Sequence, residues 1–134
     1  TVEKTYLALV TGTLSREEAI IDAAIGRSPG DRQKMSVLEN GRQAITRYKV
    51  IRRYTSFDLL EIRLLTGRTH QIRVHMASLG HPVAGDKIYG KEFDHLTRQF
   101  LHSAGLQFSH PSTAKQVKYE APLPGDIAQF LKFC

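Results

Sequence analysis

Cationic side chains crowd residues 67–76, which read GRTHQIRVHM. Arg68, His70 and Arg73 lie near the start of an expected helix, where positive charge opposes the helix dipole. A sequence that accepts this small cost should gain something from it. An arginine offers a planar fork that holds a carboxylate or a phosphate through two hydrogen bonds. The stretch therefore predicts an anion-binding site, although a solvated basic helix face fits the same pattern.

The same stretch has the periodicity of a helix. Its apolar residues recur at i, i+4 and i+7 and so share one face: Ile72, Met76 and Leu79. Thr69 or Thr66 is suited to cap the helix start, and Gly80 suits the position just after its end. His70 and Arg73 lie on a different face, together with Ala77.

Mostly strands are expected around this helix. Alternating apolar and polar residues predict strands over three segments: residues 4–10, 44–54 and 57–65. The short link at Thr55 and Ser56 predicts a hairpin between the last two. Two further strands are expected, joined by a turn at Pro111 and Ser112: residues 105–109 and 115–120.

The remaining segments are less regular. Residues 11–42 predict a long irregular excursion, and residues 95–102 a short helix. A final amphipathic helix would be capped by Asp126, with three side chains inward: Ile127, Phe130 and Leu131. The order predicts an α+β fold, with a mainly antiparallel mixed sheet, a central active-site helix and a C-terminal helix.

Composition places the chain among basic globular proteins. Its 134 residues suit one domain, and 19 Lys and Arg against 13 Asp and Glu give a formal net charge of +6. That excess favours a polyanionic partner, with nucleic acid first. The lone Cys134 excludes an internal disulfide and fits a reducing cytoplasm. No apolar run reaches membrane-spanning length, so we expect a cytoplasmic protein without a membrane partner.

Several motifs occur in a fixed order along the whole chain. Residues 65–76 read LTGRTHQIRVHM, followed by GHPV at 80–83 and GDKIYG at 85–90. The other motifs are KTYLA at 4–8, DRQKM at 31–35, AITRY at 44–48, LHSA at 101–104 and APLP at 121–124. This ordered set closely resembles the signature of the RluA/RluD-type RNA pseudouridine synthases, and it is far more specific than any one short motif.

The resemblance implies an enzyme that isomerises uridine to pseudouridine in ribosomal or transfer RNA without a cofactor. It implies two catalytic residues: Arg73 pairs with a nucleophilic aspartate, and Tyr6 stacks on the flipped-out base. Four further residues are expected at the substrate: Arg68, Thr69, His70 and Leu101. Basic residues in or beside the long excursion are expected to contact RNA phosphates, unless they only solvate a loop: Arg27, Arg32, Lys34, Arg42 and Arg47.

The nucleophile itself is not found. In the family it lies in a His-Arg-Leu-Asp motif upstream of the tyrosine strand, and this sequence has no such motif. Asp86 falls in a Gly-Asp-x-x-Tyr-Gly turn, where a structural role is favoured, and Asp31 and Asp94 have less support. The chain opens without methionine, directly in an expected strand. We therefore expect residues 1–134 to be the C-terminal part of a catalytic domain whose N-terminal part is missing.

This expectation has consequences for behaviour. The fragment alone should be inactive, and a truncated sheet would expose an edge that favours self-association. Two alternatives stay open: an RNA-binding protein that lost the chemistry, and a basic domain with no role on RNA.

Other chemistries have little support in the sequence. Six histidines invite a metal hypothesis, but His70 and His75 are about 140° apart on a helix, so no metal site is expected. His102 is expected to be structural. No Gly-x-Ser-x-Gly elbow indicates a hydrolase.

Overall fold

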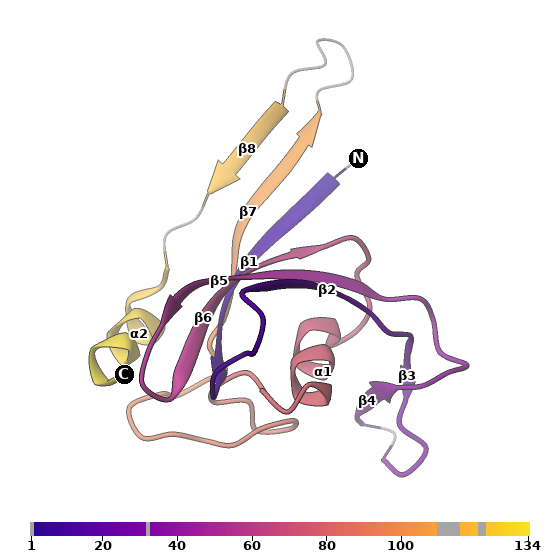
Figure 1. Cartoon of the computed structure of the whole chain (residues 1–134), viewed down its shortest axis with the longest axis horizontal. Helices are drawn as coiled ribbons and strands as arrows, with labels where there is room; N and C mark the ends of the chain where they lie inside the picture. Colours follow the sequence, from indigo (N-terminus) through magenta and orange to yellow (C-terminus); the bar gives the residue numbers. More distant parts are fainter. Residues whose placement is uncertain (1, 32, 110–115, 121–122) are drawn as a thin grey trace.

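The computed structural model describes the whole chain except residues 1, 32, 110–115 and 121–122 (Figure 1). A six-stranded sheet with the order β2-β5-β6-β1-β7-β8 forms its centre, and every neighbouring pair is antiparallel. In chain order its strands are β1 (Val2–Thr11), β2 (Glu18–Asp22), β5 (Ile45–Arg53), β6 (Phe57–Leu64), β7 (Leu101–Ser109) and β8 (Gln116–Glu120). The predicted α+β class with a mainly antiparallel sheet is confirmed.

Smaller elements surround the sheet. Strands β3 (Ile25–Arg27) and β4 (Met35–Val37) form a separate two-stranded sheet. The helices are α1 (Gln71–Ser78), α2 (Gly125–Ala128) and the 3-10 helix η1 (Gln129–Phe133). Among the described residues, no helix has the length and apolarity needed to cross a lipid bilayer.

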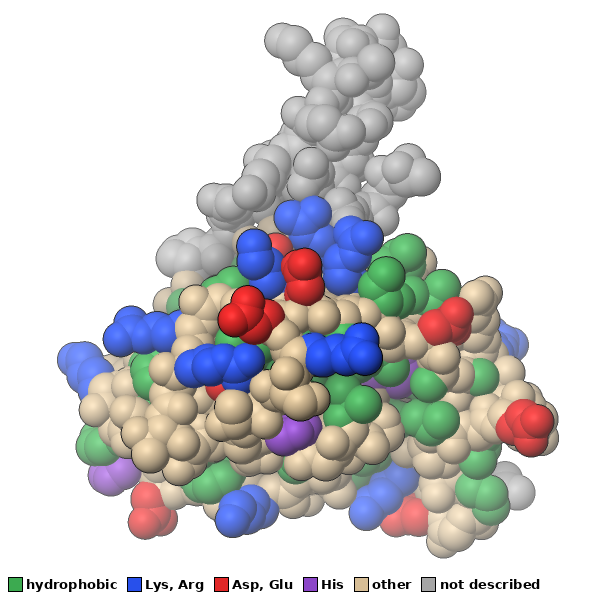
Figure 2. All heavy atoms as spheres, in the orientation of Figure 1, with side chains coloured by type: hydrophobic (Ala, Val, Ile, Leu, Met, Phe, Trp, Pro, Cys, Tyr) green, Lys and Arg blue, Asp and Glu red, His purple; other side chains and the backbone are tan. Residues whose placement is uncertain are grey.

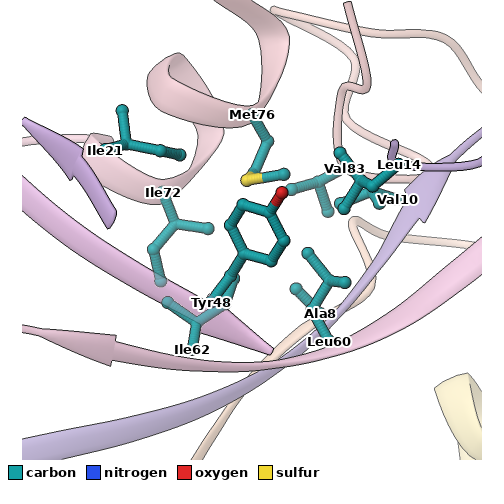
Figure 3. Packing of buried hydrophobic residues seen from close by; sticks show 10 residues of the cluster. All are labelled: Ala8, Val10, Leu14, Ile21, Tyr48, Leu60, Ile62, Ile72, Met76 and Val83. Carbon is teal, nitrogen blue, oxygen red and sulfur yellow. The ribbon is translucent and has the colours of Figure 1, made fainter. Parts of the chain in front are cut away.

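Helix α1 covers one face of the sheet because alternate strand residues point toward it. On β5, Thr46 and Tyr48 are buried while Arg47 and Lys49 are exposed, as the alternation predicts. Figure 3 shows Ile72 and Met76 of α1 directed onto the side chains of this face. The cluster consists of Ala8, Val10, Leu14, Ile21, Tyr48, Leu60, Ile62, Ile72, Met76 and Val83.

The opposite face has its own apolar cluster near the C-terminus. Here α2 and η1 pack on the residues that alternate with the first set (Figure 1). The members are Leu9, Phe57, Leu59, Ala84, Leu96, Phe100, Ile127 and Phe130. Both sheet faces therefore contribute to the core, and β1 and β6 lie in the middle of it.

The end of α1 follows the sequence. The N–H of Gly80 donates to the carbonyl of Ala77 (2.9 Å), and the N–H of His81 donates to that of Met76 (3.0 Å). This is a Schellman motif, and Gly80 has the positive φ of 83° that it requires. Leu79, predicted on the apolar face, is instead 44% exposed, because it lies past the last turn.

The start of α1 differs from the prediction. Neither Thr66 nor Thr69 caps it; the N-cap is His70, with φ 56° and ψ 22° and no side-chain cap. Thr66 instead accepts a hydrogen bond from the N–H of Ile45 (2.9 Å) and donates one to Gln71 (2.8 Å). Thr66 therefore links the start of α1 to β5 and does not cap the helix.

Two less regular segments were predicted incorrectly. Residues 11–42 contain β2, β3 and β4, whose short length hides their alternation. Residues 95–102 form no helix. His95 has a positive φ of 69°, and the backbone of Phe100 is hydrogen-bonded to distant segments rather than to its own turn. The N–H of Phe100 donates to the carbonyl of Ala84 (2.8 Å), and its carbonyl accepts from Leu9 (3.1 Å).

The C-terminal segment is helical only in part. A single α turn continues as a 3-10 helix, and its N-cap is Pro124 rather than Asp126. Asp126 instead pairs with Arg98. The three residues predicted inward do pack on the second cluster: Ile127, Phe130 and, partly buried, Leu131. Strands β7 and β8 are confirmed, while the turn predicted at Pro111 and Ser112 lies outside the described residues.

Alanine substitutions at Gly80 and Gly85 would separate the cost of a strained backbone from the cost of a steric clash. Both have positive φ, 79° and 83°, but a Cβ on Gly85 would lie 2.6 Å from the carbonyl oxygen of Arg98, whereas one on Gly80 meets no described atom within 4 Å. Gly80→Ala should destabilise by about 1–2 kcal/mol, and Gly85→Ala by about 1–3 kcal/mol more. Urea unfolding of the two variants measures the difference. Equal losses would contradict the close packing at Gly85.

Candidate active site

The site is centred on a buried ion pair between helix α1 and the turn at 85–90. Nε of Arg73 donates to Oδ2 of Asp86 (2.8 Å), and Nη2 donates to Oδ1 (2.9 Å). Asp86 is fully buried and Arg73 is only 9% exposed. The interpretation of this stretch as a solvated basic face is therefore wrong for Arg73.

The turn holds Asp86 by its own backbone. Oδ1 of Asp86 also accepts hydrogen bonds from the N–H groups of Ile88 (3.0 Å) and Tyr89 (3.1 Å). Gly90 permits the tight return, since a Cβ there would lie 3.0 Å from Cβ of Pro82. Because both carboxylate oxygens are engaged, the geometry supports a structural role for Asp86 over a nucleophilic one.

Electrostatics keep this pair charged. Its hydrogen bonds to Asp86 raise the pKa of Arg73 above its ordinary value, although burial opposes the shift. Burial alone would raise the pKa of Asp86, but the hydrogen bonds from Arg73 and from the turn hold it below its usual range. An ionised carboxylate and a guanidinium thus face each other at neutral pH.

Tyr89 lies directly beside the pair. The guanidinium carbon of Arg73 is 5.2 Å from the centre of the Tyr89 ring. The Tyr89 hydroxyl accepts a hydrogen bond from the N–H of Met35 (2.8 Å) and lies 2.9 Å from Nδ1 of His70. Sequence reasoning missed Tyr89, which links α1 to the β3–β4 sheet.

His70 is half-buried at the start of α1. Burial first, and then the positive charge of Arg73, lower the pKa of His70 below its ordinary value, against an opposing effect of Asp86. Its imidazole is therefore mainly neutral at pH 7. Two neighbouring residues were also expected to bind the substrate. Thr69 is exposed, and Nε of Arg68 donates to the carbonyl of Gln43 (2.8 Å).

Tyr6 and Leu101 lie on the sheet face that α1 covers. Tyr6 is paired with Ser103 of β7, and Leu101 is paired with Ala8 of β1, two residues along the same strands and therefore on the same face. Both side chains are half-buried and pack against the cluster that contains Ile72. The structure thus brings them to the same side of the sheet as the helix that carries Arg73.

The expected RNA-contacting cations lie on two parts of the fold: Arg27, Lys34 and Arg42 on or beside the β3–β4 sheet, and Arg47 on β5. Arg42 and Arg47 are exposed, Lys34 is half-buried, and Arg32 lies outside the described residues. Arg47 alternates with Thr46 and Tyr48, so it lies on the sheet face away from α1. Figure 2 shows Lys and Arg side chains spread over the visible face, with Asp and Glu side chains between several of them.

A buried polar network under α1 was not predicted. Nε2 of His75 donates to the carbonyl of Ala23 (2.8 Å), and its Nδ1 lies 2.7 Å from Oγ1 of Thr46. Gln71 donates to Thr46 (2.9 Å) and to the carbonyl of Ile45 (3.0 Å). The one signal in the sequence was Thr46, a polar residue on the inward face of its strand. Among the described residues, no three possible metal-ligating side chains come together.

Known proteins match this fold and these motifs. The sequence model of the family described as "RNA pseudouridylate synthase" matches residues 1–78. An "Uncharacterized RNA pseudouridine synthase YlyB" of Bacillus subtilis is 47% identical over 98% of this chain and 44% of its own length. A "Ribosomal large subunit pseudouridine synthase D" of Nitrosomonas europaea is 44% identical over 98% of this chain and 41% of its own length.

A solved structure agrees with both. "Human RNA Pseudouridylate Synthase Domain Containing 1" superposes with a TM-score of 0.78 at 28% identity, over 98% of this chain and 65% of that one. The chain therefore belongs to the RNA pseudouridylate synthase family. Relatives named pseudouridine synthase D place it with the RluA/RluD type that the motifs predicted. It spans less than half the length of these curated relatives.

Proposed function

We propose that this chain is the C-terminal half of the catalytic domain of an enzyme that isomerises specific uridines to pseudouridine in ribosomal or transfer RNA. The rest of the domain would supply the nucleophilic aspartate, which fits the greater length of the relatives. The reaction breaks the bond between the ribose and N1 of the base and forms one to C5, with no atom gained or lost.

One observation carries this proposal: the buried guanidinium of Arg73 is held in place by two of its nitrogens, while the third keeps its N–H donors available. Nε and Nη2 are held by Asp86, while Nη1 makes no hydrogen bond to the described residues. A second carboxylate arriving at Nη1 would meet a cation that is already oriented. That cation would keep the carboxylate ionised and aimed at the substrate.

The sheet face beside α1 supplies the matching place for a base. Tyr6 offers a half-buried ring on which a flipped-out pyrimidine can stack, and Leu101 offers an apolar neighbour on the same face. In this arrangement Arg73 positions the nucleophile while Tyr6 and Leu101 hold the uracil. Asp86 acts only through Arg73, as the positioning residue of the pair.

The experiment is an assay of the full-length gene product on ribosomal and transfer RNA transcripts, with pseudouridine mapped by carbodiimide-dependent reverse-transcription stops. The full-length protein should modify defined uridines, and residues 1–134 alone should modify none. Arg73→Lys, which keeps the charge but loses the fork, should reduce turnover by about 100-fold or more.

Arg98→Lys provides the matched control, because Arg98 makes the same two-bond contact with Asp126 at an exposed site. It should leave turnover unchanged. RNA binding by the full-length protein without any pseudouridine would favour the alternative, an RNA-binding domain on a catalytically dead scaffold. Turnover by residues 1–134 alone would contradict the proposed division of the domain.

A further inference from the structure

The Tyr89 hydroxyl has two hydrogen-bond partners of different character. The N–H of Met35 lies 2.8 Å from it and can only donate. Nδ1 of His70 lies 2.9 Å from it and can donate or accept, depending on the imidazole tautomer. Counting the donors and acceptors around this hydroxyl therefore shows which ring nitrogen of His70 carries the proton.

The donors and acceptors favour the tautomer of His70 that is protonated on Nε2. Because Met35 donates to the phenol oxygen, the phenol O–H proton remains available, and His70 Nδ1 is its acceptor among the described residues. A Nδ1–H tautomer would make the phenol oxygen accept twice and would leave its own proton without a partner in a part-buried place, which costs free energy. Nδ1 thus accepts, and the imidazole proton resides on Nε2.

We propose that Tyr89 is a positioning residue: its hydroxyl fixes His70 as a neutral Nε2–H donor, and this N–H binds an acceptor oxygen of the RNA substrate. The RNA contact rests on the function proposed above, whereas the tautomer does not. Nε2 makes no hydrogen bond to the described residues. The donor is therefore available for a partner from outside the described chain.

Backbone geometry and charge agree with this role. His70 has a left-handed backbone with φ 56°, a conformation that costs free energy in a residue other than glycine and is found at functional sites. Its ring meets the Tyr89 ring edge-to-face, with centroids 5.6 Å apart. The charged groups that act on it are Arg73 and Asp86, and burial together with Arg73 lowers its pKa, which preserves the neutral form.

The tautomer is measured first, by NMR of full-length protein labelled with 15N-histidine, without RNA. Loss of a signal in His70→Asn assigns the resonance, and asparagine suits the left-handed backbone. The wild type should show Nε2–H with Nδ1 unprotonated. Tyr89→Phe, which keeps the ring over Arg73, should shift the resonance toward the other tautomer or the charged form.

Tyr54→Phe is the matched control. The Tyr54 ring lies 5.0 Å from the guanidinium carbon of Arg52, as Tyr89 lies beside Arg73, but its hydroxyl makes no hydrogen bond to the described residues. It should leave the His70 resonance unchanged. A Nδ1–H tautomer in the wild type, or no change in Tyr89→Phe, would overturn the proposal whatever the enzyme's activity.

RNA binding tests the second half. Affinity of the full-length protein for its RNA should show no His70-dependent rise as the pH falls from 8 to 7 in the wild type, since the donor is uncharged. Tyr89→Phe should bind about two- to tenfold more weakly at pH 8 and become more pH-dependent. If His70→Asn binds RNA as tightly as the wild type, the RNA contact is wrong. If no pseudouridine forms while the tautomer is as expected, the proposed function fails and the assigned tautomer stands.

Discussion

Asp86→Ala is expected to lower the free energy of unfolding by about 3–5 kcal/mol, because it leaves a buried guanidinium without its carboxylate. Arg73 has no other hydrogen-bond partner among the described residues, and Asp86 also closes the turn through two backbone N–H groups. Urea denaturation at neutral pH measures the loss. Removing both charges, in Asp86→Ala with Arg73→Met, should restore part of it.

The exposed pair of Arg98 and Asp126 is the matched control. Its two hydrogen bonds, 2.8 and 3.0 Å, reproduce the geometry of the buried pair, but both side chains are about half exposed. Water and salt screen such a pair, so Asp126→Ala should change the stability very little. A loss as large as that of Asp86→Ala would show that burial does not determine the strength of the pair at Arg73.

The sequence predicted the strands and the helix that position this site better than it predicted the side-chain contacts within it. Alternation in residues 44–54 and 57–65 placed β5 and β6 with the correct faces, and Gly80 marked the end of α1. These features are local, because strand parity and helix capping depend on residues a few positions apart. The family motifs singled out Arg73, whose catalytic role stays a prediction.

Contacts between distant segments could not be read in this way. Arg73 and Asp86 are 13 positions apart, and they meet across a turn in which Gly85 has a positive φ and Gly90 lies close to Pro82. Tyr89 reaches Met35 across 54 positions, through an excursion expected to be irregular. The parity of β5 showed that Thr46 points inward but not which partner it meets. Such pairings depend on how the elements pack, which one sequence does not display.

The network around that threonine leads to the second large effect. His75→Leu is expected to destabilise the protein by about 2–4 kcal/mol, because the hydroxyl proton of Thr46 loses its acceptor and the carbonyl of Ala23 loses its donor in the core. Adding Thr46→Val should recover part of the loss, since the unpaired hydroxyl proton is then removed, while Gln71 keeps the Ile45 carbonyl as its other acceptor. If the double variant were no more stable than the single one, the hydroxyl would not be held by His75. Urea unfolding at pH 8 measures both variants.

The same histidine should make stability depend on pH. Burial lowers the pKa of His75 in the folded state, against smaller opposing effects of the Ala23 carbonyl and Asp22. Below the unfolded-state pKa of about 6.5, the unfolded chain therefore binds more protons than the folded one. Stability is complete above that pH and falls as the pH drops toward the folded-state pKa, by up to about 1.4 kcal/mol per pH unit for one proton.

His75→Leu should reduce this dependence without abolishing it, because His70 also has a lowered pKa and adds a slope of the same sign. Unfolding curves at several pH values between 5 and 8 separate the two contributions. An unchanged slope in His75→Leu would mean that the folded protein readily accommodates a charged His75. That result would contradict the order of donors and acceptors beneath α1, since Nδ1 of a charged imidazole could no longer accept the Thr46 proton.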